Sequence, residues 1–295
     1  MDTCTLCPRM CGVNRAAGEK GYCGMDATIR AARAALHMWE EPCISGTRGS
    51  GAVFFSGGSL RCIFCQNFEI AEGNCAKEIS GERLSEIFLE LQEQGAANIN
   101  LVTAAHYVPA VIESLKKAKA QGMDLPVIYN SSGYERVETV QMLEEVVDVW
   151  LPDFKYMDSK LAFAYSRAKD YPEVARAAIR EMMKAAGTCA YDEDGYIQKG
   201  VIVRHLILPG HTKNSIAVLD ELYGTYGDDL TISLMNQYTP LPQVRNIPDL
   251  NRRVTKREYE KVLDHALDLG ITQGFFQEGG TAKESFIPLF DYEGL

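Results

Sequence analysis

The pattern of hydrophobic positions becomes regular at about residue 80. Beyond it, short runs rich in valine, isoleucine and leucine alternate with segments whose apolar residues recur at helical spacing. Ser80 is the predicted N-cap of the first such helix, in which Leu84, Ile87 and Leu91 share one face. Nearly continuous apolar strands separated by amphipathic helices are typical of right-handed βαβ units and a parallel sheet.

About six or seven such units follow one another without an internal linker. The predicted strands cover 51–55, 99–103, 125–130, 147–154, 201–208, 230–237 and 271–277. The predicted helices cover 80–95, 108–120, 137–145, 161–186, 216–226 and 256–269. This pattern predicts an α/β fold and favours a partial (β/α)6-type parallel barrel over residues 51–295, with a doubly wound sheet as the alternative. A small Cys-rich metal-binding segment, 1–50, precedes it and contains an extended stretch at 27–39.

Polar residues follow several of these strands directly. In parallel barrels the chemistry lies where strands end and βα loops begin. Asp153 and Lys155 offer a carboxylate and an ammonium, and 130–133 offers an amide, hydroxyls and a glycine. A ligand with both an amine and a carboxylate would be satisfied by that mixture. The structural alternatives are an ion pair at a strand end for Asp153 and Lys155, and an ordinary turn for 130–133.

The chain has 9 cysteines, and four of them form a C-x2-C-x3-C-x11-C pattern at Cys4, Cys7, Cys11 and Cys23. In a reducing compartment, clustered cysteines are interpreted as metal ligands before disulfides. Four thiolates on a glycine-rich segment suit tetrahedral zinc or an iron–sulfur cluster, and the spacing does not separate the two. The alternative is a disordered tail with incidental cysteines.

Cys62 and Cys65 form a second pair, on the loop that leaves the strand 51–55. Gly58 stands where a third cysteine would complete C-x3-C-x2-C. Upstream, Glu40, Glu41 and Cys43 could line a site, and a turn with a buried thiol is an equally good interpretation.

The formal net charge of −10 argues against a general nucleic-acid or anionic-membrane binder. With no signal peptide and no apolar run near twenty residues, the sequence predicts a cytoplasmic protein. No P-loop, G-x-G-x-x-G or Ser-His-Asp order is present. His106 and His211 end strands and are candidate site residues, whereas His37 and His265 are interpreted as structural or surface residues. His205 lies within a strand and points either into the barrel or outward.

The segment Ser-Gly-Gly-Ser-Leu-Arg-Cys-Ile-Phe-Cys-Gln-Asn at 56–67 resembles the radical S-adenosylmethionine enzymes, and looks closest to the pyruvate formate-lyase activating enzyme-like subgroup. The resemblance covers nearly the whole chain. It includes Cys4-x2-Cys7-Pro8 and the stretches 39–46, 100–103, 151–156, 203–210, 235–240 and 277–280. It is specific for the family and much less so for the substrate.

The resemblance implies that a C-x3-C-x2-C motif holds a [4Fe–4S] cluster, with Cys62 and Cys65 as the second and third ligands. The cluster, reduced by a donor such as flavodoxin or ferredoxin, would cleave S-adenosylmethionine to a 5′-deoxyadenosyl radical that abstracts hydrogen. It also implies cofactor contacts at Phe64, Asn130, Ser131, Asp153, Lys155 and Arg204. The usual Gly-Gly-Glu loop is replaced by Thr103-Ala-Ala-His106, which leaves that contact unassigned.

Gly58 is the largest departure from the family pattern, because two thiolates hold a cubane poorly. Three explanations compete: an engineered Cys→Gly substitution, a natural lineage that lost cleavage chemistry, and replacement of the missing ligand by Ser56, Ser59 or Cys43. The expected function is radical chemistry impaired at Gly58, on a glycine of a partner enzyme or on a small molecule. The alternatives are a non-catalytic metal or ligand binder and a zinc-dependent hydrolytic barrel, which lacks a His-rich ligand set.

Overall fold

The computed structural model describes residues 2–272, 274–277 and 288–295. Its strands are β1 (Arg30–His37), β2 (Ser50–Phe55), β3 (Lys77–Glu78), β4 (Ile99–Val102), β5 (Val127–Ser131), β6 (Val149–Pro152), β7 (Ala190–Tyr191), β8 (Ile197–Leu206), β9 (Thr231–Met235) and β10 (Gly274–Phe276). Its α-helices are α1 (Phe68–Ala71), α2 (Gly81–Glu93), α3 (Val108–Ala120), α4 (Val137–Leu143), α5 (Ser159–Ser166), α6 (Tyr171–Ala186), α7 (Thr212–Tyr226) and α8 (Lys256–Asp268).

The strands form one sheet in the order β10-β9-β8-β6-β5-β4-β2-β1-β3, with β7 paired to β8 outside this path. From β2 to β10 along that order the pairs are parallel. β1 joins β2 antiparallel, and β3 joins β1 antiparallel. The predicted partial parallel barrel is therefore confirmed. The sequence boundary at 50/51 falls inside β2, and β1, on its N-terminal side, belongs to the sheet.

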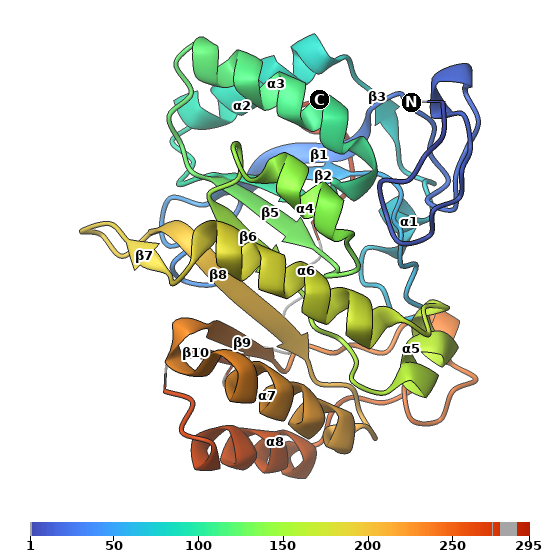
Figure 1. Ribbon diagram of the computed structural model, residues 1–295, viewed down its shortest axis with the longest axis vertical. Coiled ribbons are helices and arrows are strands. Elements are labelled where there is room, and N and C mark those ends of the chain that lie inside the picture. Colours follow the sequence, from blue (N-terminus) through green and yellow to red (C-terminus); the bar gives the residue numbers. More distant parts are fainter. Residues whose placement is uncertain (1, 273, 278–287) are drawn as a thin grey trace.

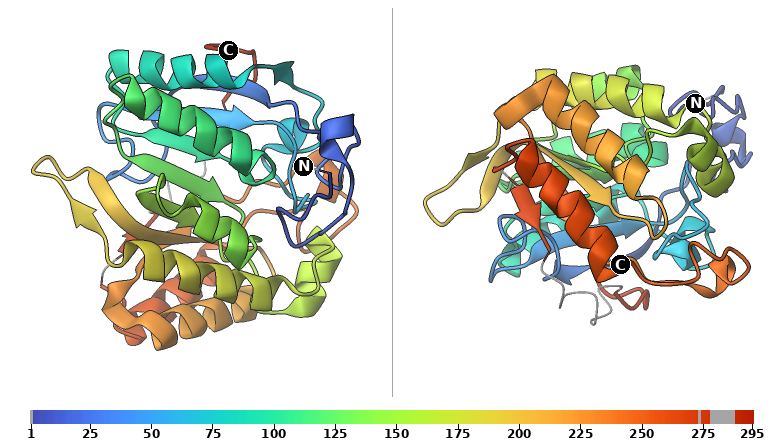
Figure 2. Two further views of the ribbon diagram at one scale, coloured as in Figure 1. Left: turned by 45° about the horizontal axis from the view of Figure 1, so that its top comes forward. Right: turned by 90° about the horizontal axis from the view of Figure 1, so that it is seen from below.

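Helices cover the outer face of the sheet, where α3, α4, α6 and α7 lie side by side (Figures 1 and 2). Residues of alternating strand positions, such as Leu101, Tyr129 and Trp150, pack against the apolar faces of these helices. The helix boundaries follow local signals. Ser80 caps α2 by accepting from the backbone N–H of Arg83, and Thr255 with Glu258 forms a capping box on α8.

The long helix predicted for 161–186 is wrong in one respect, because two helices stand there. α5 ends where Arg167 takes a left-handed conformation, with φ of 52°, and α6 begins with a proline in its first turn. The break carries the chain around the end of the barrel. The Gly-Gly pair of the 277–280 motif and one residue of the predicted strand 271–277 lie outside the described residues.

The inner face of the barrel is apolar at the N-terminal ends of its strands. Ile128, Val149 and Ile202 pack there against Cys43 and Ile44, which come from the β1–β2 connection. The backbone N–H of Ile197 donates to the Cys43 carbonyl at 2.9 Å and fixes this connection to β8. The barrel is thus closed at one end by an apolar plug and open at the other.

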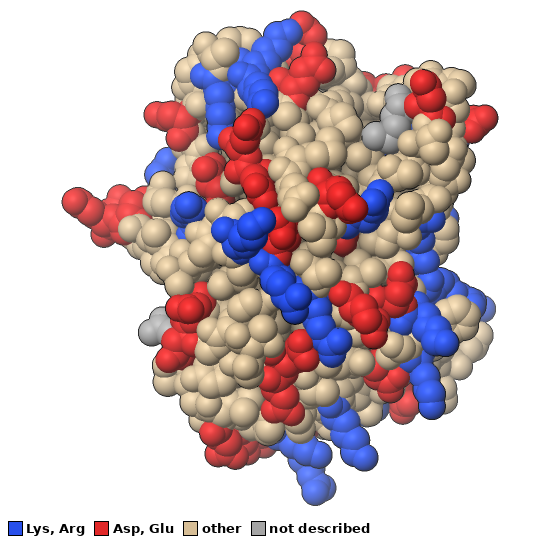
Figure 3. Space-filling view, viewed as in Figure 1, with Lys and Arg blue, Asp and Glu red and all other residues tan. Residues whose placement is uncertain are grey.

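Within the described part of the chain, no helix is both long and apolar enough to span a bilayer. On the face shown in Figure 3, acidic and basic side chains lie intermixed.

We predict that Ile44→Ala lowers the free energy of unfolding by about 2–5 kcal/mol, because Ile44 is fully buried in the plug and its loss leaves a cavity. Leu267→Ala, on a side chain that is 56% exposed in α8, changes it by less than about 0.5 kcal/mol. Urea denaturation followed by circular dichroism measures both. Equal midpoints for the two variants would contradict the assigned plug.

Candidate functional site

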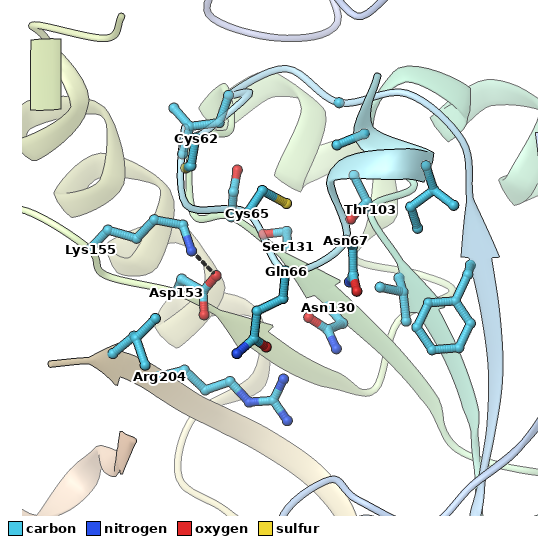
Figure 4. Close-up of a pocket in the computed structure, with 18 of the residues that line it drawn as sticks. Cys62, Cys65, Gln66, Asn67, Thr103, Asn130, Ser131, Asp153, Lys155 and Arg204 are labelled. Carbon is cyan, nitrogen blue, oxygen red and sulfur yellow. Dashed lines mark hydrogen bonds and ion pairs between the residues drawn. The ribbon is translucent and has the colours of Figure 1, made fainter. Parts of the chain in front are cut away.

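A cavity of about 250 Å³ opens at the carboxyl ends of the barrel strands. The loop between β2 and α1, the ends of β4, β5 and β6, and β8 contribute its walls. All of the predicted cofactor contacts and the second cysteine pair line it: Cys62, Phe64, Cys65, Asn130, Ser131, Asp153, Lys155 and Arg204. Figure 4 shows the two thiols above the Asp153–Lys155 pair, with Arg204 on the opposite side.

The two thiols are half-buried, and they are uncharged at neutral pH when nothing is bound to them. Burial is the main cause that raises the pKa of Cys65 to about 12. The nearby Cys62 thiol also raises this pKa, and its effect is larger than the opposite effect of the Lys155 charge. Burial also raises the pKa of Cys62, whose Sγ accepts from the Ser166 hydroxyl at 3.0 Å. A metal bound here would have to displace both protons.

Gly58 lines the same cavity and leaves space beside it. A Cβ built on Gly58 would meet the Thr103 methyl at 3.8 Å and the Ala71 Cβ at 4.0 Å, both ordinary contacts. The φ of Gly58 lies outside the left-handed region, so a side chain is tolerated there. Neighbouring Gly57 differs: its φ is +93° and an added Cβ would lie 2.5 Å from Met25.

Asp153 and Lys155 form an ion pair inside the cavity, drawn as a dashed line in Figure 4. Burial alone would lower the pKa of Lys155, but Asp153, Cys62 and Cys65 outweigh it and raise the pKa. The Tyr171 hydroxyl holds this loop, because it accepts from the Lys155 N–H and donates toward the Ser132 and Asp153 carbonyls, each at 2.9 Å. Sequence reasoning missed Tyr171, which lies in the first turn of α6.

Arg204 is bound by two carboxylates from the β1–β2 connection. Its guanidinium pairs with Glu40 and, through Nε at 2.9 Å, with Glu41. Burial would lower the pKa of Arg204, and the two carboxylates raise it well above its usual value. Glu40 also accepts from the Asn100 amide at 3.0 Å and the Asn130 amide at 3.4 Å. Arg204, predicted as a cofactor contact, therefore has its charge balanced within the chain.

Glu135 is a further carboxyl at the cavity wall, 2% exposed, with no partner for its Oε2 atom. Burial raises the pKa of Glu135 to about 8. The side chain is therefore mostly protonated at neutral pH. No sequence signal marks it, since its position shortly before α4 is typical of a surface residue.

Four further sequence candidates do not line the cavity: His106, His211, Ser56 and Cys43. Burial lowers the pKa of His106 to about 4, and its Nε2 lies 2.7 Å from the Ser56 carbonyl. His211 bonds to Tyr165 through Nε2 at 2.8 Å. The Ser56 hydroxyl donates to the Cys75 carbonyl at 2.6 Å, and Cys43 lies in the apolar plug. Of the residues considered for replacing a ligand at position 58, Ser59 alone lines the cavity.

The N-terminal segment packs beside the rim of the barrel. Arg9 donates to the carbonyls of Ser59 and Ser166, each at 2.9 Å, and so joins the segment to the loop of the second cysteine pair. Cys4, Cys7 and Cys23 are buried and Cys11 is exposed. Within residues 2–272, 274–277 and 288–295, no three His, Cys, Asp or Glu side chains lie in positions to hold a metal ion. The four cysteines remain predicted ligands.

No protein-family model matches the chain. The uncharacterized protein MJ0674 of Methanocaldococcus jannaschii is 28% identical over 270 residues, which cover 89% of this chain and 74% of that protein. Among solved structures, HydG, a maturase of the [FeFe]-hydrogenase, matches with a TM-score of 0.50 and 16% identity over 72% of this chain and 48% of its own. Streptococcus suis SuiB bound to S-adenosylmethionine matches with a TM-score of 0.49 and 13% identity over 77% of this chain and 50% of its own.

The chain spans about half the length of these two solved chains. At this identity, the match with HydG shows a shared fold and nothing further.

We predict that Glu135→Gln stabilises the protein increasingly as pH rises from 4.5 to about 8. The unfolded carboxyl loses its proton from pH 4.5, while the buried one keeps it to about 8, so rising pH favours the unfolded state of the unmodified chain. The difference in the free energy of unfolding between Glu135→Gln and the unmodified chain grows by about 1.4 kcal/mol per pH unit and levels off above pH 8. Urea denaturation of both proteins across pH 5–9 tests it. A difference independent of pH would contradict the raised pKa.

Proposed function

We propose that this chain is a radical S-adenosylmethionine protein, with the cofactor site in the barrel cavity. The observation that carries the proposal is the convergence of Cys62, Cys65 and the Asp153–Lys155 pair on one cavity of about 250 Å³. The C-x2-C loop with its flanking Ser-Gly-Gly-Ser-Leu-Arg resembles that family, and the fold shared with HydG is compatible with it.

The cavity offers suitable partners for the amino-acid moiety and the adenine of S-adenosylmethionine. Asp153 and Lys155 supply opposite charges for an amino-acid moiety, and Asn130 and Ser131 supply an amide and a hydroxyl beside them. Phe64 lines the cavity and packs against Tyr156 and Tyr238, whose ring centroids lie 6.4 and 6.2 Å from its own. Its ring, supported in this way, suits the flat, apolar face of an adenine.

The residues present fit this ligand better than they fit a complete cluster. A reduced [4Fe–4S] cluster held by three thiolates supplies the electron that cleaves the sulfonium, and this chain supplies two of the three at Cys62 and Cys65. The third position is Gly58, and the space beside it is open. We therefore assign to this chain cofactor binding with impaired cleavage.

Two substrate classes follow from the family resemblance: a glycine on a partner enzyme, and a small molecule. The apolar plug closes the far end of the barrel, so a substrate reaches the cavity only from the rim. An electron donor such as flavodoxin or ferredoxin belongs to the same proposal.

The N-terminal cysteines Cys4, Cys7, Cys11 and Cys23 are proposed to bind zinc or a second iron–sulfur cluster. The pKa of Cys23 is raised by burial and by the nearby Cys4 and Cys11 thiols, and that of Cys7 by burial and by Cys4 and Cys23. The four sulfurs are thus close enough to interact, although the thiols are not arranged around a metal position.

Gly58→Cys is expected to raise the iron held at this site after anaerobic reconstitution and to increase 5′-deoxyadenosine formation by at least about tenfold, because it supplies the third thiolate. Gly58→Ser is the matched control, similar in size but with a poor iron ligand, and should stay at the level of the unmodified chain. Iron analysis and chromatography of the products measure the two effects. Equal iron and equal cleavage in Gly58 and Gly58→Cys proteins would overturn the proposal.

Metal at the N-terminal segment is tested separately. The double variant Cys62→Ser/Cys65→Ser should retain the metal bound there, whereas Cys4→Ser/Cys7→Ser should lose it, because each removes two ligands of one site. Elemental analysis for zinc and iron distinguishes the two metals. If the Cys4→Ser/Cys7→Ser protein is folded and retains all of its metal, these cysteines are not ligands.

A further inference from the structure

The barrel interior has a polar level between the apolar plug and the rim, which we call the floor: Glu40, Glu41, Asn100, Asn130 and Arg204. Glu40 and Arg204 line the cavity, while Glu41 braces Arg204 and does not line it. The floor lies below the two thiols, and Figure 4 shows Arg204 across the cavity from them. A ligand placed between rim and floor touches both.

The ion pairs around the cavity leave one carboxylate in excess. Arg204 pairs with both Glu40 and Glu41, and Lys155 pairs with Asp153, so three carboxylates face two cations. Arg61 also lines the cavity and is a further cation of its wall, so the excess is local to the floor, where Glu40 and Glu41 both pair with Arg204. Burial holds Glu135 protonated and His37 neutral, and the Arg61 guanidinium lies over the Tyr22 ring, 5.4 Å from its centroid, toward the N-terminal segment.

A second observation at the same level calls for a hydrogen-bond donor. The amide nitrogen of Asn100 donates to Glu40, and the Oδ1 of the same amide is buried without a partner. Asn100 is 0% exposed. An unpartnered buried acceptor costs free energy, and because Asn100 does not line the cavity, a bridging water rather than a ligand atom would recover it. Above the floor, Phe54, Val102 and Leu206 give the cavity apolar walls.

We propose that the floor binds the positively charged end of the substrate, which is an amine with an apolar body seated with its ammonium against Glu40. An ammonium group balances the excess carboxylate and brings three donors to a level rich in acceptors. The apolar body lies along Phe54, Val102 and Leu206 toward the rim. This inference rests on the proposed function, because the amine is a substrate only if the chain carries out radical chemistry. Its binding test does not require S-adenosylmethionine.

The test uses three probes of one shape, n-hexylammonium, n-hexanol and n-hexanoate, titrated calorimetrically into the full chain at pH 7.5. Salt at 0.15 M screens the overall charge of −10. We expect hexylammonium to bind at least about tenfold more tightly than either other probe. Glu40→Gln should abolish this preference and Glu40→Asp should retain most of it. The control Glu82→Gln removes one exposed carboxylate on α2 and should leave the preference for hexylammonium unchanged.

Tighter or equal binding of hexanol or hexanoate to the unmodified chain overturns the inference, whatever the variants do and even if Glu40→Gln fails to fold. An unchanged preference in folded Glu40→Gln also overturns it. S-adenosylmethionine binding, measured in the same proteins, separates the two proposals. Its absence with an intact amine preference refutes the proposed function alone, and its presence without that preference refutes the amine-binding floor alone.

Discussion

The ion cluster of Glu40, Glu41 and Arg204 is the interaction on which the site depends. It joins the β1–β2 connection to β8, elements separated by 163 residues between Glu41 and Arg204. Charges this buried are costly unless paired, so removing one member leaves the others uncompensated. Because Glu40 also accepts from side chains on β4 and β5, one carboxylate fixes the positions of three strands around the cavity. The plug at Ile44 follows from the same connection, four residues further along.

The sequence predicted the alternation of strands and helices well, because buried parallel strands and amphipathic helices have distinct periods. α3 coincides with its predicted range, and Ser80 caps α2 as predicted. The single helix expected for 161–186 was wrong because apolar spacing alone does not reveal a left-handed residue such as Arg167. Residues that directly follow strands, such as Asp153 and Lys155, could be assigned to the rim since parallel strands end at one edge.

The residues that sequence reasoning missed share a different property, because their roles arise from contacts between distant segments. Asn100 looks like one polar position in an apolar strand until Glu40 is found beside it. Tyr171 begins a helix, and only the fold brings its hydroxyl to the loop of Asp153 and Lys155. Arg9 is one basic residue in a Cys-rich segment, yet it holds the loop that carries Cys62. Spacing along the chain contains no information on such pairs.

The open space beside Gly58 bears on how readily a cysteine could arise at this position by mutation. Its backbone conformation suits any residue, and an added Cβ makes only ordinary contacts, so no second substitution is needed to accommodate a cysteine. Glycine and cysteine codons differ by a single base when they share the third position. Where the codon of Gly58 shares its third base with a cysteine codon, a single point mutation restores the thiol and leaves the rest of the cavity intact.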